Sequence, residues 1–367
     1  MEPKPDHVPA PARADKSDRI NNFDLIRLFA AAQVAVIHAF NNLNVELGFL
    51  GYLSWFPGVP VFFFISGFLI VKSWENTKSQ PSRFVENRFL RLYPALWVCL
   101  AVTIASVFST GYPAKQGIAV GQWAKWCLAQ LTFIQFYNPD FLRSYGLGVV
   151  NGSLWTISVE LQFYVLAPLV AWMIRKKNAA LYLFCAASIV LHIINESFNP
   201  RTTAAWKLLT VSFGPWVFMF VFGAMVSMYR PWLDYIKRQN PVVLLVLYVI
   251  VYGVSIHFNL GGGNGLTLPA FILFAALATN LAFYKPDTAK RWLRDNDISY
   301  GLYIYHKPVY NWFIYTGLVA NGVYLALALL VTTLLAVASW RFIEKPALGR
   351  KRATIRSAPA ISPAAAA

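Results

Sequence analysis

The sequence predicts an all-α, polytopic integral membrane protein with about ten transmembrane helices and both termini in the cytoplasm. Hydrophobic residues make up 57% of the 367 residues and charged residues 13%, about half of the charged share in soluble domains. The apolar residues form runs close to the roughly 20 residues that a helix needs to cross a bilayer. Basic residues gather in short clusters between these runs, as membrane topology requires.

The spans are predicted from the apolar runs and their polar borders, in chain order. They cover residues 22–44, 57–74, 91–110, 155–174, 179–197, 206–229, 241–258, 265–284, 297–317 and 320–343. The run 120–137 is interrupted by Lys125, so we interpret it as an amphipathic or partly inserted element on the outer face. The transmembrane domain then covers 22–346, and the polar tails 1–21 and 347–367 are predicted to be disordered in the cytoplasm.

The distribution of charge supports this topology and excludes one class of function. With both ends inside, the cytoplasmic segments hold basic clusters at 72–91, 175–177, 230–238, 285–294 and 341–356. The net charge of +16 therefore reflects membrane topology and does not indicate a nucleic-acid partner. The three cysteines lack the spacing of metal ligands, so no metal site is predicted.

Arg27 and His38 lie eleven residues apart inside the first span. Ionisable groups within a membrane helix are costly and mark function by default. Eleven residues of helix return to nearly the same face and rise about 16 Å along the axis. One face therefore carries a fixed cation towards the cytoplasm and a titratable imidazole towards the outer side, which suits an elongated anionic ligand.

Glu160 lies near the start of a span that returns from the outer side, so we expect it at the depth of His38. A carboxylate beside a histidine can orient the ring and hold its proton, and the pair can act as a general base. The alternatives are a histidine satisfied by the fold or a structural ion pair. The shared depth and the spacing to Arg27 favour function.

Arg88 and Arg91 open the third span at the cytoplasmic boundary, on adjacent turns of one helix face. Two guanidinium groups so placed can hold phosphate bidentately. Anchoring of the helix by positive charge explains them equally well when they are taken alone. Arg27 also has a structural alternative, because Asp24 three residues earlier can pair with it.

Four further residues are candidates for shaping a site. Ser66 and Gly67 in the second span permit close approach of a ligand or, as we favour on physical grounds, of another helix. His306 in the ninth span either lines a cavity or satisfies the backbone freed by Pro308. Trp155 is expected to be an anchor at the outer interface.

Six motifs follow one another along almost the whole chain. They are Arg27-x10-His38, FFFISGFLI (62–70), RFLRLYP (88–94), SLWTISVELQFY (153–164), ISYGLYIYHKPV (298–309) and FIEKP (342–346). In this order, with ten spans, the chain resembles the integral-membrane acyltransferases of acyltransferase family three, which include bacterial polysaccharide and antigen O-acetyltransferases. Any one of the motifs alone would be weak evidence.

The resemblance implies transfer of an acyl group, usually acetyl, from cytoplasmic acyl-CoA to a sugar hydroxyl across the bacterial inner membrane. Acyl-CoA, most commonly acetyl-CoA, is then a donor substrate, and no bound cofactor is expected. By motif match the catalytic residues would be His38, Arg27 and Glu160. The substrate-binding residues would be Arg88, Arg91, Ser66, Gly67, Trp155 and His306. Expected partners are membrane lipid, a carbohydrate acceptor and proteins of polysaccharide biosynthesis or export.

Several alternatives remain open at this level. His38 can activate the acceptor hydroxyl directly, or its ring can carry the acyl group as an acyl-imidazole. The acyl group can be acetyl or succinyl, and neither the acceptor nor the oligomeric state is specified. A saccharide or small-acid transporter, or a non-catalytic partner of an export machine, would also hold buried charges. Against a transporter, no pair of Gly/Pro-interrupted spans recurs in two halves of the chain.

Overall fold

The computed structural model describes residues 21–77, 80–197, 203–294 and 296–350, and within these ranges all regular structure is helical. Residues 1–20 and 351–367, which make up nearly all of the two predicted tails, lie outside the described residues. The described start of the second tail, 347–350, is helical. It continues the last membrane helix, so the prediction of disorder is wrong for these four residues.

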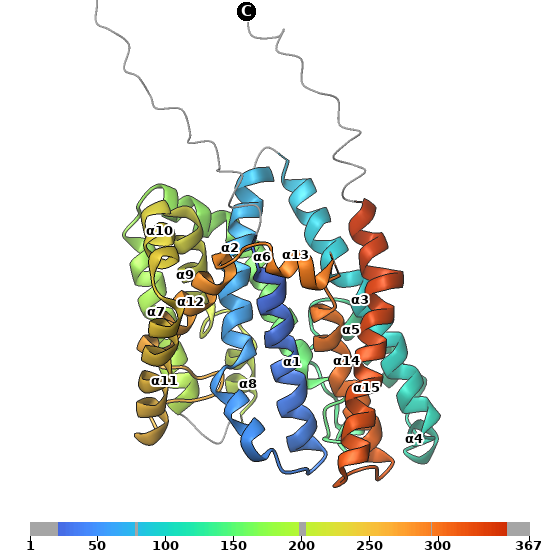
Figure 1. Ribbon diagram of the computed structural model, residues 1–367. Helices are drawn as coiled ribbons and strands as arrows, with labels where there is room; N and C mark the ends of the chain where they lie inside the picture. Colours follow the sequence, from blue (N-terminus) through green and yellow to red (C-terminus); the bar gives the residue numbers. More distant parts are fainter. Residues whose placement is uncertain (1–20, 78–79, 198–202, 295, 351–367) are drawn as a thin grey trace, which may run out of the picture.

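The helices form one bundle, in which the long members stand side by side (Figure 1). The α-helices are α1 (Phe23–Asn42), α2 (Gly58–Thr77), α3 (Pro81–Ser109), α4 (Tyr112–Lys115), α5 (Val120–Leu131), α6 (Trp155–Arg175), α7 (Ala180–Ser197), α8 (Ala204–Thr210), α9 (Val217–Met228), α10 (Arg230–Arg238), α11 (Pro241–His257), α12 (Leu268–Phe283), α13 (Thr288–Leu293), α14 (Ser299–Tyr315) and α15 (Gly322–Ser339). Short 3-10 turns are η2 (Gly48–Trp55), η3 (Asp140–Leu142) and η4 (Gly152–Leu154), and η5 (Trp340–Glu344) is a π-helical turn.

The membrane character is clear, but ten full-length spans are not confirmed. Among the described residues, six helices are long and apolar enough to cross a membrane, namely Phe23–Asn42, Gly48–Thr77, Pro81–Ser109, Gly152–Arg175, Ala180–Ser197 and Gly322–Arg350. A seventh candidate joins α10 and α11 across a bend of 95°. The predicted spans 206–229, 265–284 and 297–317 instead contain α9, α12 and α14, which have 12, 16 and 17 residues.

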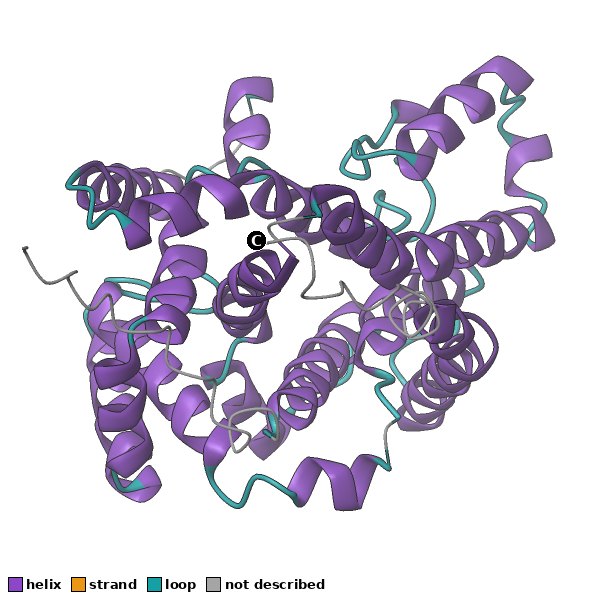
Figure 2. Cartoon of the chain, turned by 90° about the horizontal axis from the view of Figure 1, so that it is seen from above, coloured by secondary structure: helices purple, strands orange, loops and turns teal. Residues whose placement is uncertain are grey.

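The helices α9 and α14 are short because the bundle, not the bilayer, surrounds them. Nearly all side chains of α14 are buried, and most of those of α9 are too. Figure 2 shows the bundle from above, with helices packed side by side in more than one layer. Helices that are covered by protein need not match the thickness of the hydrocarbon layer.

The central helix α2 packs most closely against α9, and glycines make this contact possible. A β-carbon added at Gly67 would overlap the backbone carbonyl of Phe220, and one added at Gly223 would overlap that of Phe64. Small residues let membrane helices approach closely and gain packing contacts. Gly67 therefore packs two helices together, as sequence physics favours, and the structure gives no support to its prediction as a substrate-binding residue.

The segment between α3 and α6 forms a small packed unit at the end of the bundle opposite the start of α1 (Figure 1). Its helix α5 buries Trp123, Trp126 and Gln130 on one face and exposes Lys125 on the other. This confirms the predicted amphipathic element within 120–137. The buried tryptophans pack with Tyr112 and other apolar side chains of the same unit, so this long connection has a core of its own.

Candidate functional site

Two adjoining cavities lie among α1, α2, α3, α6 and α14. The first, which we name the arginine cavity, has a volume of about 100 Å³ and is lined by Arg27, Arg88 and Arg91. The second, the histidine cavity, has a volume of about 540 Å³ and is lined by His38. The two cavities share Val59 and Tyr303 in their walls. Arg27 and His38 thus line two neighbouring cavities at different levels of α1.

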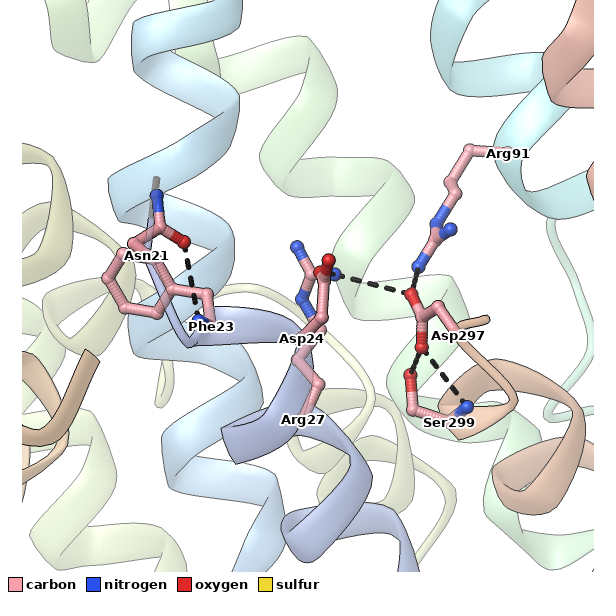
Figure 3. A network of polar contacts seen from close by, with 7 residues as sticks. All are labelled: Asn21, Phe23, Asp24, Arg27, Arg91, Asp297 and Ser299. Carbon is pink, nitrogen blue, oxygen red and sulfur yellow. Dashed lines mark hydrogen bonds and ion pairs between the residues drawn. The ribbon is translucent and has the colours of Figure 1, made fainter. Parts of the chain in front are cut away.

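Arg27 and Arg91 are held by one carboxylate that the sequence analysis did not single out. Asp297, in the segment between α13 and α14, accepts a 2.6 Å bond from Arg91 and lies 3.5 Å from Arg27 (Figure 3). The same carboxylate accepts from the backbone amide of Ser299 at 3.1 Å and from its hydroxyl. Two guanidinium groups and two donors of Ser299 thus surround this one carboxylate. In the sequence, the signal for Asp297 is an acidic residue directly before a membrane helix.

Arg27 also makes the predicted pair with Asp24, at 2.8 Å. The side chain of Asp24 is 56% exposed, so this pair contributes little to stability. Arg27 therefore does have a structural ion pair, and its more buried partner is Asp297. The charges of Arg27 and Arg91 are thus balanced by the two carboxylates of Asp24 and Asp297.

Arg88 is the arginine with unused hydrogen-bonding capacity. Its Nη2 donates to Ser73 Oγ at 3.2 Å, and its guanidinium lies 5.7 Å from the ring centre of Tyr164. In the described part of the chain its buried Nε has no hydrogen-bond partner. A buried donor without a partner is costly, and an anionic ligand oxygen at this point would satisfy it.

Glu160 lines the arginine cavity and accepts a 2.7 Å hydrogen bond from Tyr164. The expectation that it lies beside His38 is therefore corrected. The helix α6 begins at Trp155, which lines the histidine cavity. Glu160 follows five residues later, about 7.5 Å further along the axis, and this rise carries it to the level of the arginines. Ser66 lies there too.

His306 takes the place beside His38 that was predicted for Glu160. The Nε2 atom of His306 lies 3.0 Å from Nδ1 of His38 and 3.0 Å from Oγ of Ser153. The two rings are stacked, with their centres 5.2 Å apart. His306 is completely buried, whereas His38 is partly exposed to its cavity. His306 thus contacts His38 but does not itself line the histidine cavity.

The protons of the two rings decide what His38 can do. If His306 donated to Nδ1 of His38, Nε2 of His38 would carry its own proton and could not accept another. If Nδ1 of His38 donates to His306, Nε2 of His38 keeps a free lone pair. Only this second tautomer makes the neutral His38 a proton acceptor, because a neutral imidazole has one donor and one acceptor nitrogen.

The wall between the cavities is fixed by hydrogen bonds. The hydroxyl of Tyr303 bonds Thr156 Oγ1 at 2.8 Å and donates to the carbonyl of Ser153 at 3.3 Å. Lys307 lines the histidine cavity beside His38. Trp155 was expected to be an interfacial anchor, but the structure makes it a wall of the histidine cavity that packs on Trp216, with ring centres 5.3 Å apart.

A comparison with known proteins identifies the family of this chain. The family described as Acyltransferase domain matches residues 20–341, so the chain belongs to this family and is an acyltransferase of the membrane-embedded kind. No solved structure was found to match it.

Three relatives illustrate the similarity. The chain is 32% identical to Nodulation protein 10 of Rhizobium leguminosarum bv. viciae, over 92% of this chain and 96% of the relative. It is 28% identical to an O-acetyl transferase of Shigella phage Sf6, over 90% of this chain and 96% of the relative. It is 26% identical to the O-acetyltransferase OatA of Staphylococcus aureus, over 88% of this chain but 56% of that protein.

Proposed function

We propose that the protein is an O-acyltransferase of the bacterial inner membrane. It would move an acyl group, acetyl by first choice, from cytoplasmic acyl-CoA to a hydroxyl of an exported or cell-surface carbohydrate. The single observation that carries the proposal is the pair of adjoining cavities, one lined by three arginines and the next by His38. The names of two relatives, both O-acetyltransferases, support the choice of an oxygen acceptor and of acetyl.

The arginine cavity suits part of a long anionic donor. Its volume of about 100 Å³ is well below the roughly 300–1,000 Å³ of ordinary ligand pockets. A thin pantetheine arm fits such a space better than a nucleotide does. The CoA phosphates would then stay at the mouth of the cavity beside Arg88, while the thioester reaches the level of His38. The rise of about 16 Å between Arg27 and His38 is of the right order for this reach.

His38 would act as the general base. Its Nε2 takes the proton of the acceptor hydroxyl as the oxygen bonds the thioester carbon. The carbon–sulfur bond then breaks, and the CoA sulfur leaves and receives a proton from the imidazolium. An acyl-imidazole formed first on His38 is the other route, and accumulation of an acyl-enzyme with acyl-CoA alone would favour it.

The experiment is an acyl-transfer assay with the purified full-length protein. Radiolabelled acetyl-CoA and the envelope glycan of cells lacking the gene are incubated with wild type, His38→Ala and His257→Ala. His257 lies at the end of α11 and lines neither cavity, so it is the matched control. Loss of a general base lowers the rate about 10²–10⁴-fold. Full transfer by the His38 variant would overturn the proposed role of His38.

A further inference from the structure

A third cavity of about 800 Å³ adjoins the histidine cavity. It is bounded by α5, α6, α8 and the segment 135–151. Val149, Gly152, Trp155 and Asn264 line both cavities, so the third cavity is a direct neighbour of the one that His38 lines. None of the residues predicted from the sequence, apart from Trp155, lies in it.

The lining has the chemistry of a carbohydrate site. Its wall contains both amide side chains and aromatic rings, among them Gln130, Asn138, Asn151, Tyr137, Trp155 and Trp216. Amides donate and accept hydrogen bonds in pairs, as vicinal sugar hydroxyls do. Aromatic rings offer large apolar faces at little cost in conformational entropy. The volume falls within the range of small-ligand pockets.

The amides are held rigidly, and one of them has an unused acceptor. Gln130 donates to the carbonyls of Gln135 and Tyr137 at 3.2 and 3.1 Å. Asn151 donates from Nδ2 to the carbonyl of Ile304 at 2.9 Å. Its Oδ1 is buried and has no partner among the described residues. A ligand hydroxyl could donate a hydrogen bond to this oxygen. Asn151 lies two residues before Ser153, whose hydroxyl contacts His306.

The charged side chains in the wall of the third cavity disfavour an acyl chain as its ligand, and they do not require a strongly anionic ligand. Arg143 and Lys207 line the cavity together with Glu196. Arg143 already pairs with Asp140 at 3.7 Å. An acyl chain would place apolar surface against these charged side chains, which is unfavourable. A neutral or weakly acidic saccharide can use all of them.

We propose that this cavity binds the saccharide acceptor and presents one of its hydroxyls past Trp155 to His38. The inference rests on the proposed function for the identity of the acceptor, but not for the existence of the saccharide site. Tyr137, with 38% of its surface exposed, offers a ring for stacking, and the exposed Lys207 offers hydrogen bonds at the rim.

The test compares a double variant of the cavity with a matched double variant outside it. The first is Tyr137→Ser with Lys207→Gln. The control is Tyr182→Ser with Lys125→Gln, which replaces exposed residues of the same types on α7 and α5 that line none of the three cavities. The probe is the water-soluble glycan fraction released from the envelope of cells lacking the gene.

Two readouts are measured on protein with unchanged thermal stability. Calorimetric titration without acyl-CoA gives the Kd for the glycan, and acyl transfer from acetyl-CoA gives the KM for it. Loss of one stacking ring and one charged hydrogen-bond donor is expected to raise both values at least tenfold. The Kd for acetyl-CoA and all values of the control variant should match wild type.

Each outcome decides one of the two claims. Equal glycan Kd and KM in the cavity variant and the control would overturn the acceptor site while leaving acyl transfer intact. Glycan binding that depends on Tyr137 and Lys207, without any acyl transfer by wild type, would support the saccharide site and refute the proposed function. Binding of envelope peptides in place of glycan would overturn the saccharide assignment.

Discussion

At the residue scale, the position of one proton between two imidazoles sets the chemistry. His38 faces a cavity, and the buried His306 holds its Nδ1 at 3.0 Å. The hydroxyl of Ser153 lies 3.0 Å from the same Nε2 of His306, so Ser153 and His38 share this one nitrogen. The arrangement resembles a base with an orienting partner, in which the partner selects the tautomer and the angle of the ring.

His306 can therefore be tested as a positioning residue. His306→Phe keeps a ring but removes the acceptor for His38, and we expect kcat to fall roughly 10²-fold because the wrong tautomer blocks the base. His306→Gln keeps a side-chain acceptor and should recover part of the loss. The KM for acetyl-CoA should not change in either variant. Equal kcat values for the Phe and Gln variants would show that His306 does not position His38 through a hydrogen bond and only packs against it.

The arginines of α3 are predicted to differ, although the sequence presents them as a pair. Arg88→Lys loses the unpaired Nε donor and the planar fork, so the KM for acetyl-CoA should rise about tenfold or more. Arg91→Lys breaks the bond to Asp297 and should mainly lower the thermal stability. Donor titration and thermal unfolding of both variants separate the two effects. The reverse pattern would assign donor binding to Arg91.

At the element scale, the contact between α2 and α9 positions the site. The helix α2 contributes Val59 to both cavities and Ser66 to the arginine cavity. Its other side lies directly on the backbone of α9 through Gly67 and Gly223. The apolar core around this contact includes Phe63 and Phe163, whose rings meet edge to face at 5.2 Å.

This contact gives a prediction about stability. Gly67→Ala forces the backbones of α2 and α9 apart, and overpacking of this kind typically costs about 1–3 kcal/mol. Gly253→Ala on α11 is the control, because its β-carbon would meet the side chain of Trp55 at an ordinary 3.6 Å. Thermal unfolding in detergent should show a lower Tm for Gly67→Ala only. Equal Tm values would mean that the helices separate at little cost.

At the scale of the whole molecule, three cavities succeed one another through the bundle. The arginine and histidine cavities share a wall, and the histidine cavity and the third cavity share Trp155. The start of α1 and the end of the C-terminal helix lie at the same end of the bundle, with α4 at the other (Figure 1). This order fits a donor that enters from one side and an acceptor that enters from the other.

The orientation in the membrane is a further prediction. With both termini inside, Lys125 on α5 should face outwards and Lys237 on α10 the cytoplasm. In a cysteine-free protein, Lys125→Cys should react with an impermeant maleimide in intact cells, and Lys237→Cys only after lysis. If both cysteine variants reacted in intact cells, the predicted number of membrane crossings between residues 125 and 237 would be wrong.

The membrane class, the amphipathic α5, the position of Arg27 and His38 at different levels of one helix and the family resemblance all followed from the sequence. These features depend on composition, local periodicity and spacing within one helix, which the order of residues determines. Only the tertiary structure shows the partner of His38, the different contacts of Arg88 and Arg91, the carboxylate Asp297 and the third cavity. They depend on which helices meet and at what depth, and a pattern along the chain does not measure contacts between helices that are hundreds of residues apart.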